Sequence, residues 1–414
     1  MNTISTDVKD KVKSFILEGI DISSPEVTAQ KDPFWESLQS TGTEIWLDTG
    51  DIDAASKLWS AEMRALTTNN TLLNKEIQKG IYDDYMKEAN EYLKDLDLET
   101  RIMEIAFILN ARHGLRLVQK FGGKVSVELH TNLSHDYEGI IEYGQRFHEI
   151  CPSNFIIKVP LTPTGLLGAR RLRELGIAVN FTLGFSARQN AIITKFVKPN
   201  YVNVFLGRLN SYVKSNMLGD GTNVGEKATI ASQHTVNKVN QTISNPVTKQ
   251  IAASMRSSDQ LKKLAGVDVF TMPANVAEDG HANLDGAFES MLQQDYKVSL
   301  KDTVDLDEVQ LEKCWEVGDA VFQFAEDLDK NIPFSAEEII DRAHKAGLGD
   351  MFPQLNNNEE GAIKQDGKIP NHNKWSTQIR KGEVAVDTLL NLGGLSAFEA
   401  DQAALDDRIK SVIT

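Results

Sequence analysis

Short apolar runs alternate with longer segments of helical spacing from about residue 44 to residue 272. A polar loop follows each run, and most loops lead into a segment such as TGLLGARRLRELG (164–176), whose apolar residues recur at helical intervals. This alternation predicts right-handed βαβ crossovers and therefore a parallel sheet. The eight runs are TEIWLDT (43–49), RALTTN (64–69), KVSVELH (124–130), FIIKVP (155–160), IAVNFT (177–182), YVNVF (201–205), KQIAASMR (249–256) and VDVFTM (267–272).

Eight such units predict an α/β fold, and specifically a single closed (β/α)8 barrel of the TIM type. The alternative, an open doubly wound sheet that binds a dinucleotide, would carry a G-x-G-x-x-G turn after its first strand, and DTGDID (48–53) lacks it. We therefore expect residues 1–43 to form an N-terminal helix and lead-in, 44–283 the barrel, and 284–414 a helical extension packed on the barrel.

The extension itself is predicted in three parts. Residues 284–346 have the pattern of helices separated by short loops, whereas 347–374 are polar and rich in Gly and Asn, which indicates an extended loop. A final pair of helices is expected over 376–391 and 395–411, with Gly393 and Gly394 as the turn between them.

Composition limits the possible partners and the compartment. The chain of 414 residues carries 59 acidic and 44 basic residues, a formal charge of −15, which argues against nucleic acid or an anionic membrane as a general partner. Its two cysteines, Cys151 and Cys314, form no C-x-x-C pair and are expected to be packing residues in a reducing compartment. Neither a leader pattern nor an apolar run of about 20 residues is present, so we expect a soluble, cytoplasmic protein.

Lys158 interrupts the apolar run FIIKVP, which makes it the first candidate for chemistry. An unpaired ammonium is costly to bury, so a buried lysine tends to give up its proton. The neutral amine is the nucleophile that attacks a ketone to form an imine. The alternative is that Lys158 lies at an exposed strand end or forms a structural ion pair with a carboxylate.

Polar side chains also end most of the other runs, where the active face of such a barrel lies. Any one of them could cap a helix or form a turn, and for Asn69 and Thr182 that alternative is the better one. Seven strands with polar groups at the same end are harder to explain by capping alone. These residues are Asp48, Asn69, Glu128, Asn180, Thr182, Asn203, Ser254 and Arg256.

Two arginines are candidates for holding an anion, because the planar guanidinium suits phosphate oxygens. They are Arg208 in FLGRLN and Arg256 in ASMRSS, and the alternative for each is a solvated surface residue. A metal site is not expected, because the histidines, among them His113 and His130, show no zinc-helix spacing such as H-E-x-x-H. No cofactor is expected either.

Taken in chain order, these blocks resemble the transaldolase family. The similarity covers nearly all of residues 44–282 and the last 40 residues, and it is most specific around Lys158 and Thr182. Its motifs are LDTGDID (47–53), TTNNTLLNK (67–75), VSVELH (125–130), IIKVPLTPTGL (156–166), NFTLGFSARQN (180–190), FLGR (205–208), ASMRSSDQLKKLAGVDVFTM (253–272) and the ending KWSTQI…AFEADQAALDDRI (374–409). Asn70 differs from the proline, and Asn203 from the serine, that are usual in this pattern.

The resemblance implies a role for each matching residue. Lys158 would form the Schiff base, Asp48 would move the proton of the C4 hydroxyl, and Glu128 would shuttle protons through a water held by Thr182. The remaining residues would bind the substrate: Asn69 and Asn180 the dihydroxyacetone part, and Arg208, Ser254 and Arg256 the phosphate. Asn203 and Phe205 are expected to contact the substrate as well.

The implied activity is transfer of dihydroxyacetone between ketose and aldose phosphates in the pentose phosphate pathway. Two alternatives stay open at this point: a fructose-6-phosphate aldolase, against which Phe205 argues because aldolase-type relatives tend to have tyrosine there, and a non-catalytic sugar-phosphate-binding barrel. The expected partners are small sugar phosphates, with a homodimer as one compatible assembly.

Overall fold

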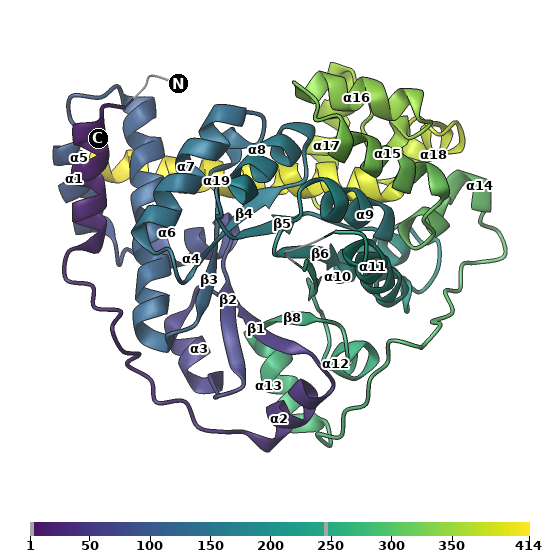
Figure 1. Cartoon of the computed structure of the whole chain (residues 1–414), viewed down its shortest axis with the longest axis horizontal. Coiled ribbons are helices and arrows are strands. Elements are labelled where there is room, and N and C mark those ends of the chain that lie inside the picture. Colours follow the sequence, from purple (N-terminus) through teal and green to yellow (C-terminus); the bar gives the residue numbers. More distant parts are fainter. Residues whose placement is uncertain (1–3, 244–246) are drawn as a thin grey trace.

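The computed structural model describes residues 4–243 and 247–414, and its centre is a closed barrel of eight parallel strands arranged in chain order (Figure 1). Each strand overlaps one of the predicted apolar runs, so the predicted (β/α)8 barrel is confirmed. The strands are β1 (Glu44–Asp48), β2 (Met63–Thr67), β3 (Lys124–Glu128), β4 (Phe155–Pro160), β5 (Val179–Thr182), β6 (Tyr201–Phe205), β7 (Lys249–Ala253) and β8 (Val269–Pro273).

Helices follow the strands, and several begin at a side chain that caps them. Thr162 accepts a hydrogen bond from the Gly165 amide at the start of α8, with Pro163 at the first helical position, and Ser186 caps α9 in the same way. The helices of the barrel region are α3 (Ile52–Leu58), α4 (Asn70–Ile77), α5 (Asp83–Tyr92), α6 (Leu98–Phe121), η1 (Thr131–Leu133), α7 (Tyr137–Ile150), α8 (Pro163–Glu174), α9 (Ala187–Phe196), α10 (Leu206–Ser215), α11 (Val224–Asn240), α12 (Asp259–Leu264) and α13 (Ala274–Asn283).

Strand register sets the candidate residues level with one another. Lys158 on β4 pairs with Glu128 on β3 and with Asn180 on β5. On the other side of the barrel, Asp48 on β1 pairs with Thr67 on β2. Because parallel strands direct their carboxyl ends to the same rim, these side chains converge at one end of the barrel.

The flanking segments contain more helix than predicted. Two helices precede the barrel, where one had been expected: α1 (Thr6–Leu17) and α2 (Pro33–Ser40). The C-terminal helices are α14 (Leu306–Val309), η2 (Leu311–Cys314), α15 (Asp319–Lys330), α16 (Ala336–Lys345), η3 (Gly349–Met351), α17 (Asn357–Asp366), α18 (His372–Arg380) and α19 (Val386–Ile413). Within the described ranges, no helix combines the length and apolar character needed to cross a membrane.

Two predictions for the secondary structure of the extension were wrong in part. Residues 284–305 hold no helix, although short loops between helices had been expected there. The supposed loop over 347–374 contains α17, which begins with a capping box: Asn356 accepts from the Glu359 amide, and the Glu359 carboxylate accepts from the Asn356 amide. This reciprocal cap stabilises a helix start in spite of the polar composition around it.

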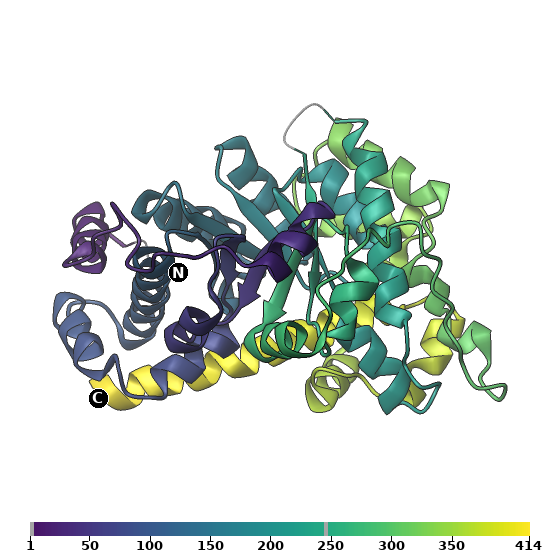
Figure 2. The ribbon, with the colours of Figure 1, turned by 90° about the horizontal axis from the view of Figure 1, so that it is seen from below.

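The predicted turn at Gly393 and Gly394 is also wrong, because α19 runs through both glycines as one helix (Figures 1 and 2). The glycines serve close packing. A Cβ on Gly394 would lie 2.7 Å from Arg208 Nη1, and a Cβ on Gly393 would lie 2.6 Å from the Gly367 carbonyl oxygen. Gly394 therefore lets α19 lie close to Arg208 at the barrel rim, and Gly393 lets it lie close to the segment that follows α17.

A buried ion-pair network ties the extension to the barrel. Arg188 on α9 binds the Asp387 carboxylate of α19 with two nitrogens, at 2.9 and 2.8 Å, and its third nitrogen binds Asp350 at 2.9 Å. Lys313 also contacts Asp350, at 2.8 Å. Removing one member of such a buried group leaves an unpaired charge, which is strongly destabilising, so this network fixes where α19 lies.

Candidate active site

A cavity of about 220 Å³ lies at the end of the barrel where the carboxyl ends of the strands meet. Nine of the eleven residues predicted from the sequence line it, which leaves only Glu128 and Thr182 outside the lining. The nine are Asp48, Asn69, Lys158, Asn180, Asn203, Phe205, Arg208, Ser254 and Arg256. Residues that lie far apart in the sequence, from Asp48 to Arg256, thus meet in one pocket.

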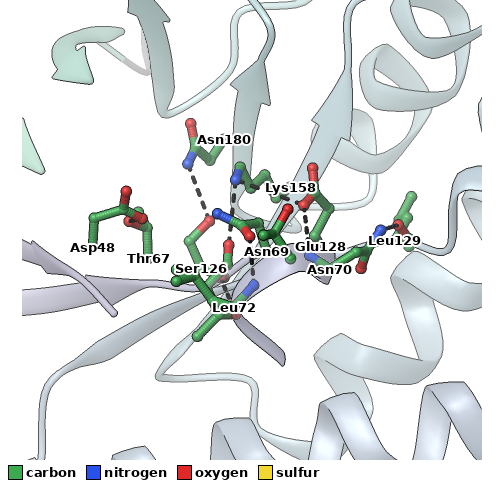
Figure 3. Close-up of polar contacts among 12 residues, drawn as sticks. Asp48, Thr67, Asn69, Asn70, Leu72, Ser126, Glu128, Leu129, Lys158 and Asn180 are labelled. Carbon is green, nitrogen blue, oxygen red and sulfur yellow. Dashed lines mark hydrogen bonds and ion pairs between the residues drawn. The ribbon is translucent and has the colours of Figure 1, made fainter. Parts of the chain in front are cut away.

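Lys158 is buried, with 4% of its surface exposed, and its amine faces a carboxylate (Figure 3). The Nζ atom lies 3.8 Å from Glu128 Oε2 and donates a hydrogen bond to the Thr68 carbonyl oxygen at 3.3 Å. Glu128 is buried as well, and burial raises the pKa of its carboxyl group, against the opposing effect of Lys158. An amine and a carboxyl group so close together can exchange a proton, directly or through one water.

A chain of two threonine hydroxyl groups leads to the Asp48 carboxylate. The Thr67 hydroxyl donates to Asp48 Oδ1 at 2.8 Å, and the Thr271 hydroxyl lies 2.7 Å from the Thr67 hydroxyl. Because the Thr67 hydroxyl proton is used in the hydrogen bond to Asp48, the Thr271 hydroxyl is the donor in the second bond. Burial raises the pKa of Asp48, and the charge of Lys158 opposes that rise. A carboxyl group of raised pKa suits a base that must also return its proton.

The asparagines form a chain across the strands. Asn203 Nδ2 donates to Asn180 Oδ1 at 3.2 Å, and Asn180 Nδ2 donates to Ser126 Oγ at 3.0 Å. Asn203 therefore orients the Asn180 amide. Asn69 caps α4, since its side-chain oxygen accepts from the Leu72 amide at 2.8 Å, as the capping alternative predicted. The side-chain nitrogen of Asn69, Nδ2, is not used by the cap, and the residue also lines the cavity.

Two arginines, Arg208 and Arg256, also line the cavity. Arg208 is buried, and burial together with the nearby charge of Arg256 lowers its pKa to about 10, so it stays charged at neutral pH. Ser254 adopts a left-handed backbone conformation, with φ of 62°, directly after β7. Within the described residues, Arg208 Nη1 and Ser254 Oγ are buried without a hydrogen-bond partner. These groups fit an anion with several acceptor oxygens.

Several lining residues were missed in the sequence. Thr67 and Thr271 lie in the apolar runs and carry the same signal, a polar residue within a strand, that singled out Lys158. Lys75 on α4 and Lys368, between α17 and α18, add two cations. Phe398 of α19 also lines the pocket, with its ring centre 5.7 Å from Lys158 Nζ and 5.6 Å from the Arg208 guanidinium carbon.

Thr182 is fully buried, and its hydroxyl has no hydrogen-bond partner in the described part of the chain. It does not cap a helix, since the next helix, α9, begins at Ala187 and is capped by Ser186, so the capping alternative is not met here. Its role in holding a water for Glu128 stays a prediction. A buried hydroxyl with an unmet hydrogen bond is what such a role requires.

No cluster of three or more histidine, cysteine or acidic side chains with the spacing of a metal site occurs among residues 4–243 and 247–414. His113 is engaged elsewhere: its ring nitrogens lie 2.8 Å from the Gly50 carbonyl oxygen and 2.9 Å from the Tyr82 hydroxyl. Burial lowers the His113 pKa to about 4, so its ring is neutral. Cys151 and Cys314 are buried and unpaired, as predicted for packing residues.

Comparison with known proteins gives the class of this barrel. The family model described as transaldolase/fructose-6-phosphate aldolase matches residues 45–332. The chain belongs to this family, and it is an enzyme of the transaldolase/aldolase kind.

Relatives from bacteria and from a yeast are named as members of the same class. A transaldolase of Xanthomonas euvesicatoria is 27% identical over 241 residues, covering 56% of this chain and 73% of the relative. A probable transaldolase of Exiguobacterium sibiricum is 31% identical over 215 residues, covering 51% and 86%. A transaldolase of Schizosaccharomyces pombe is 27% identical over 252 residues, covering 59% and 76%.

Proposed function

We propose that this protein is a transaldolase that carries a dihydroxyacetone unit from sedoheptulose 7-phosphate to glyceraldehyde 3-phosphate, giving erythrose 4-phosphate and fructose 6-phosphate, in the pentose phosphate pathway. The observation that carries the proposal is the buried Lys158 amine, 3.8 Å from Glu128, in a cavity that also contains Asp48 and two arginines. The names of the relatives support the same activity.

The first half of the reaction forms the imine. The Lys158 amine attacks the C2 carbonyl of the ketose, and the resulting carbinolamine loses water to give an iminium. Glu128 moves the protons: it takes one from the attacking nitrogen and gives one to the departing hydroxyl. The side-chain amide of Asn180 and the side-chain Nδ2 group of Asn69, which the helix cap does not use, would hydrogen-bond to the substrate hydroxyls at C1 and C3.

The second half breaks and remakes a carbon–carbon bond. Asp48 takes the proton of the C4 hydroxyl, the C3–C4 bond breaks, and its electron pair flows into the iminium to give an enamine, while the aldose phosphate leaves. The acceptor aldehyde then binds, the enamine carbon attacks it, and Asp48 returns the proton to the new hydroxyl. Water finally hydrolyses the iminium and releases the new ketose and the free amine.

Acceptor dependence tests the activity. With fructose 6-phosphate alone, a transaldolase should release free dihydroxyacetone only slowly, and adding erythrose 4-phosphate should start rapid formation of sedoheptulose 7-phosphate. Steady release of dihydroxyacetone without an acceptor would assign the aldolase activity instead. Absence of turnover under both conditions would favour a binding protein and overturn the proposal.

Replacing Arg256 with alanine should raise KM for fructose 6-phosphate about 10- to 100-fold, the effect of losing roughly 1.5–3 kcal/mol of charge-assisted hydrogen bonding. Unphosphorylated fructose should react with unchanged kcat/KM, because it lacks the phosphate. Arg171→Ala, which removes an exposed arginine of α8 paired with Glu174, is the matched control. Steady-state kinetics with both sugars decides, and an equal loss on both would remove Arg256 from phosphate binding.

A further inference from the structure

One contact of Glu128 comes from the backbone of a different element. Asn70 is the first residue of α4, and its amide N–H donates to Glu128 Oε2 at 3.2 Å (Figure 3). The amides of the first helical turn have no partner inside their own helix, so this donor is available to a group outside it. The Asn70 side chain contributes little, since its Nδ2 reaches only the Leu129 carbonyl oxygen, at 3.5 Å.

The same oxygen, Oε2, lies 3.8 Å from Lys158 Nζ. The Asn70 amide therefore fixes the oxygen that faces the reacting amine. A second contact holds the backbone at this point, because Asn110 Nδ2 on α6 donates to the Glu128 carbonyl oxygen at 2.7 Å. A donor to one oxygen of a carboxylate favours its charged form and fixes its direction.

We infer that the backbone amide of Asn70 is a positioning group, which directs the Glu128 carboxylate at the Lys158 amine and favours its charged form. The inference rests on the proposed function, because it assigns Glu128 the proton transfers of imine formation. It concerns the N–H of residue 70 and not its side chain, so any residue except proline would supply it.

Burial and several charged groups also shift the pKa of Glu128. Burial raises its pKa, and Asp48 from β1 acts in the same direction. Lys158 from β4, the Asn70 amide and Arg208 from α10 lower it. His130 and Tyr143 share a small cavity with Glu128, and the Tyr143 hydroxyl is bound to Glu104. A change confined to the amide of residue 70 leaves all of these groups in place.

Proline is the substitution that removes this N–H alone. It is well suited to the first position of a helix, where its missing donor costs no helical hydrogen bond. The preceding residue must be extended, and Asn69 already is, with φ of −157° and ψ of 170°. Asn70→Pro should therefore fold, and Asn70→Ala, which keeps the N–H, is its matched control.

The test is the pH dependence of kcat for fructose 6-phosphate cleavage with an acceptor present. Loss of the donor raises the pKa of Glu128, so the limb of the profile that Glu128 sets should move upward by about one pH unit in Asn70→Pro. The profile of Asn70→Ala should match that of the unmodified protein. In a Glu128→Gln background, adding Asn70→Pro should change kcat less than twofold, because the glutamine side chain carries no ionisable group whose charged form the amide could favour.

Superimposable profiles for a folded Asn70→Pro protein and the unmodified protein would overturn the inference, and so would an equal shift in Asn70→Ala. Circular dichroism and thermal melting establish folding first. If the proline protein does not fold, an ester in place of the amide at residue 70 removes the same donor and is expected to give the same shift. The proposed function is judged separately: its failure would be seen in the unmodified protein, as absence of a borohydride-stable adduct on Lys158.

Discussion

A protein with methionine in place of Lys158 is expected to lose about 10⁴-fold or more in kcat/KM for fructose 6-phosphate, because the substitution removes the amine that forms the proposed covalent intermediate. Methionine fills much of the same space without an amine, so the fold should be retained. The loss should be measured with saturating acceptor, beside thermal unfolding as a check of the fold.

Lys75 and Lys368 provide matched controls, since both are lysines that line the same cavity. Lys75→Met and Lys368→Met should form the imine and turn over, with any loss confined to KM for phosphorylated sugars. If Lys158→Met keeps more than a tenth of the activity, or if one of the control variants is the inactive one, the nucleophile has been assigned to the wrong lysine.

Replacing Asp48 with asparagine should lower kcat about 10²- to 10⁴-fold, the usual range for losing a general base. The imine should still form, because that step uses Lys158 and Glu128. Borohydride should therefore trap the intact six-carbon ketose on the Asp48→Asn protein, since the C3–C4 bond is not cleaved. Peptide mass mapping reads the size of the adduct directly.

The pH dependence should follow from the raised pKa of Asp48. Asp48 must be ionised to take a proton, so activity should fall as the pH drops through a pKa above the ordinary aspartate range, and Asp48→Asn should lack this limb. Asp51→Asn is the control, because residue 51 caps α3 and asparagine also caps. A three-carbon adduct on Asp48→Asn at the normal rate would contradict the role of Asp48.

Much of the barrel and its site could be predicted because both depend on local sequence. Strands of this barrel are short apolar runs, and a polar residue such as Lys158 within one is visible without any structure. The rule that active residues lie at the carboxyl ends of the strands then brings distant segments together. This reasoning led to Asp48 and Glu128 as candidates, and nine of the eleven candidate residues line one cavity.

What was missed depends on packing between distant segments. Phe398 reaches the cavity only because α19 crosses the barrel rim (Figure 2), and Lys368 reaches it from the segment between α17 and α18. Nothing local in the sequence around either residue indicates this. Gly393 and Gly394 resemble a turn, yet they let the helix approach Arg208 and Gly367 closely. The Asn70 amide is a backbone group that any residue except proline supplies, so the residue type permits its contact with Glu128 but does not predict it.

The central claim is that Lys158 carries the substrate as a Schiff base, and borohydride trapping tests it most directly. The unmodified protein should be incubated with fructose 6-phosphate without an acceptor, reduced, digested and mapped by mass. The enamine left after cleavage is in equilibrium with its iminium, which borohydride reduces, so we expect one three-carbon adduct in the peptide that contains IIKVPLTPTGL. Absence of an adduct, or an adduct on Lys75 or Lys368 instead, would contradict the assignment.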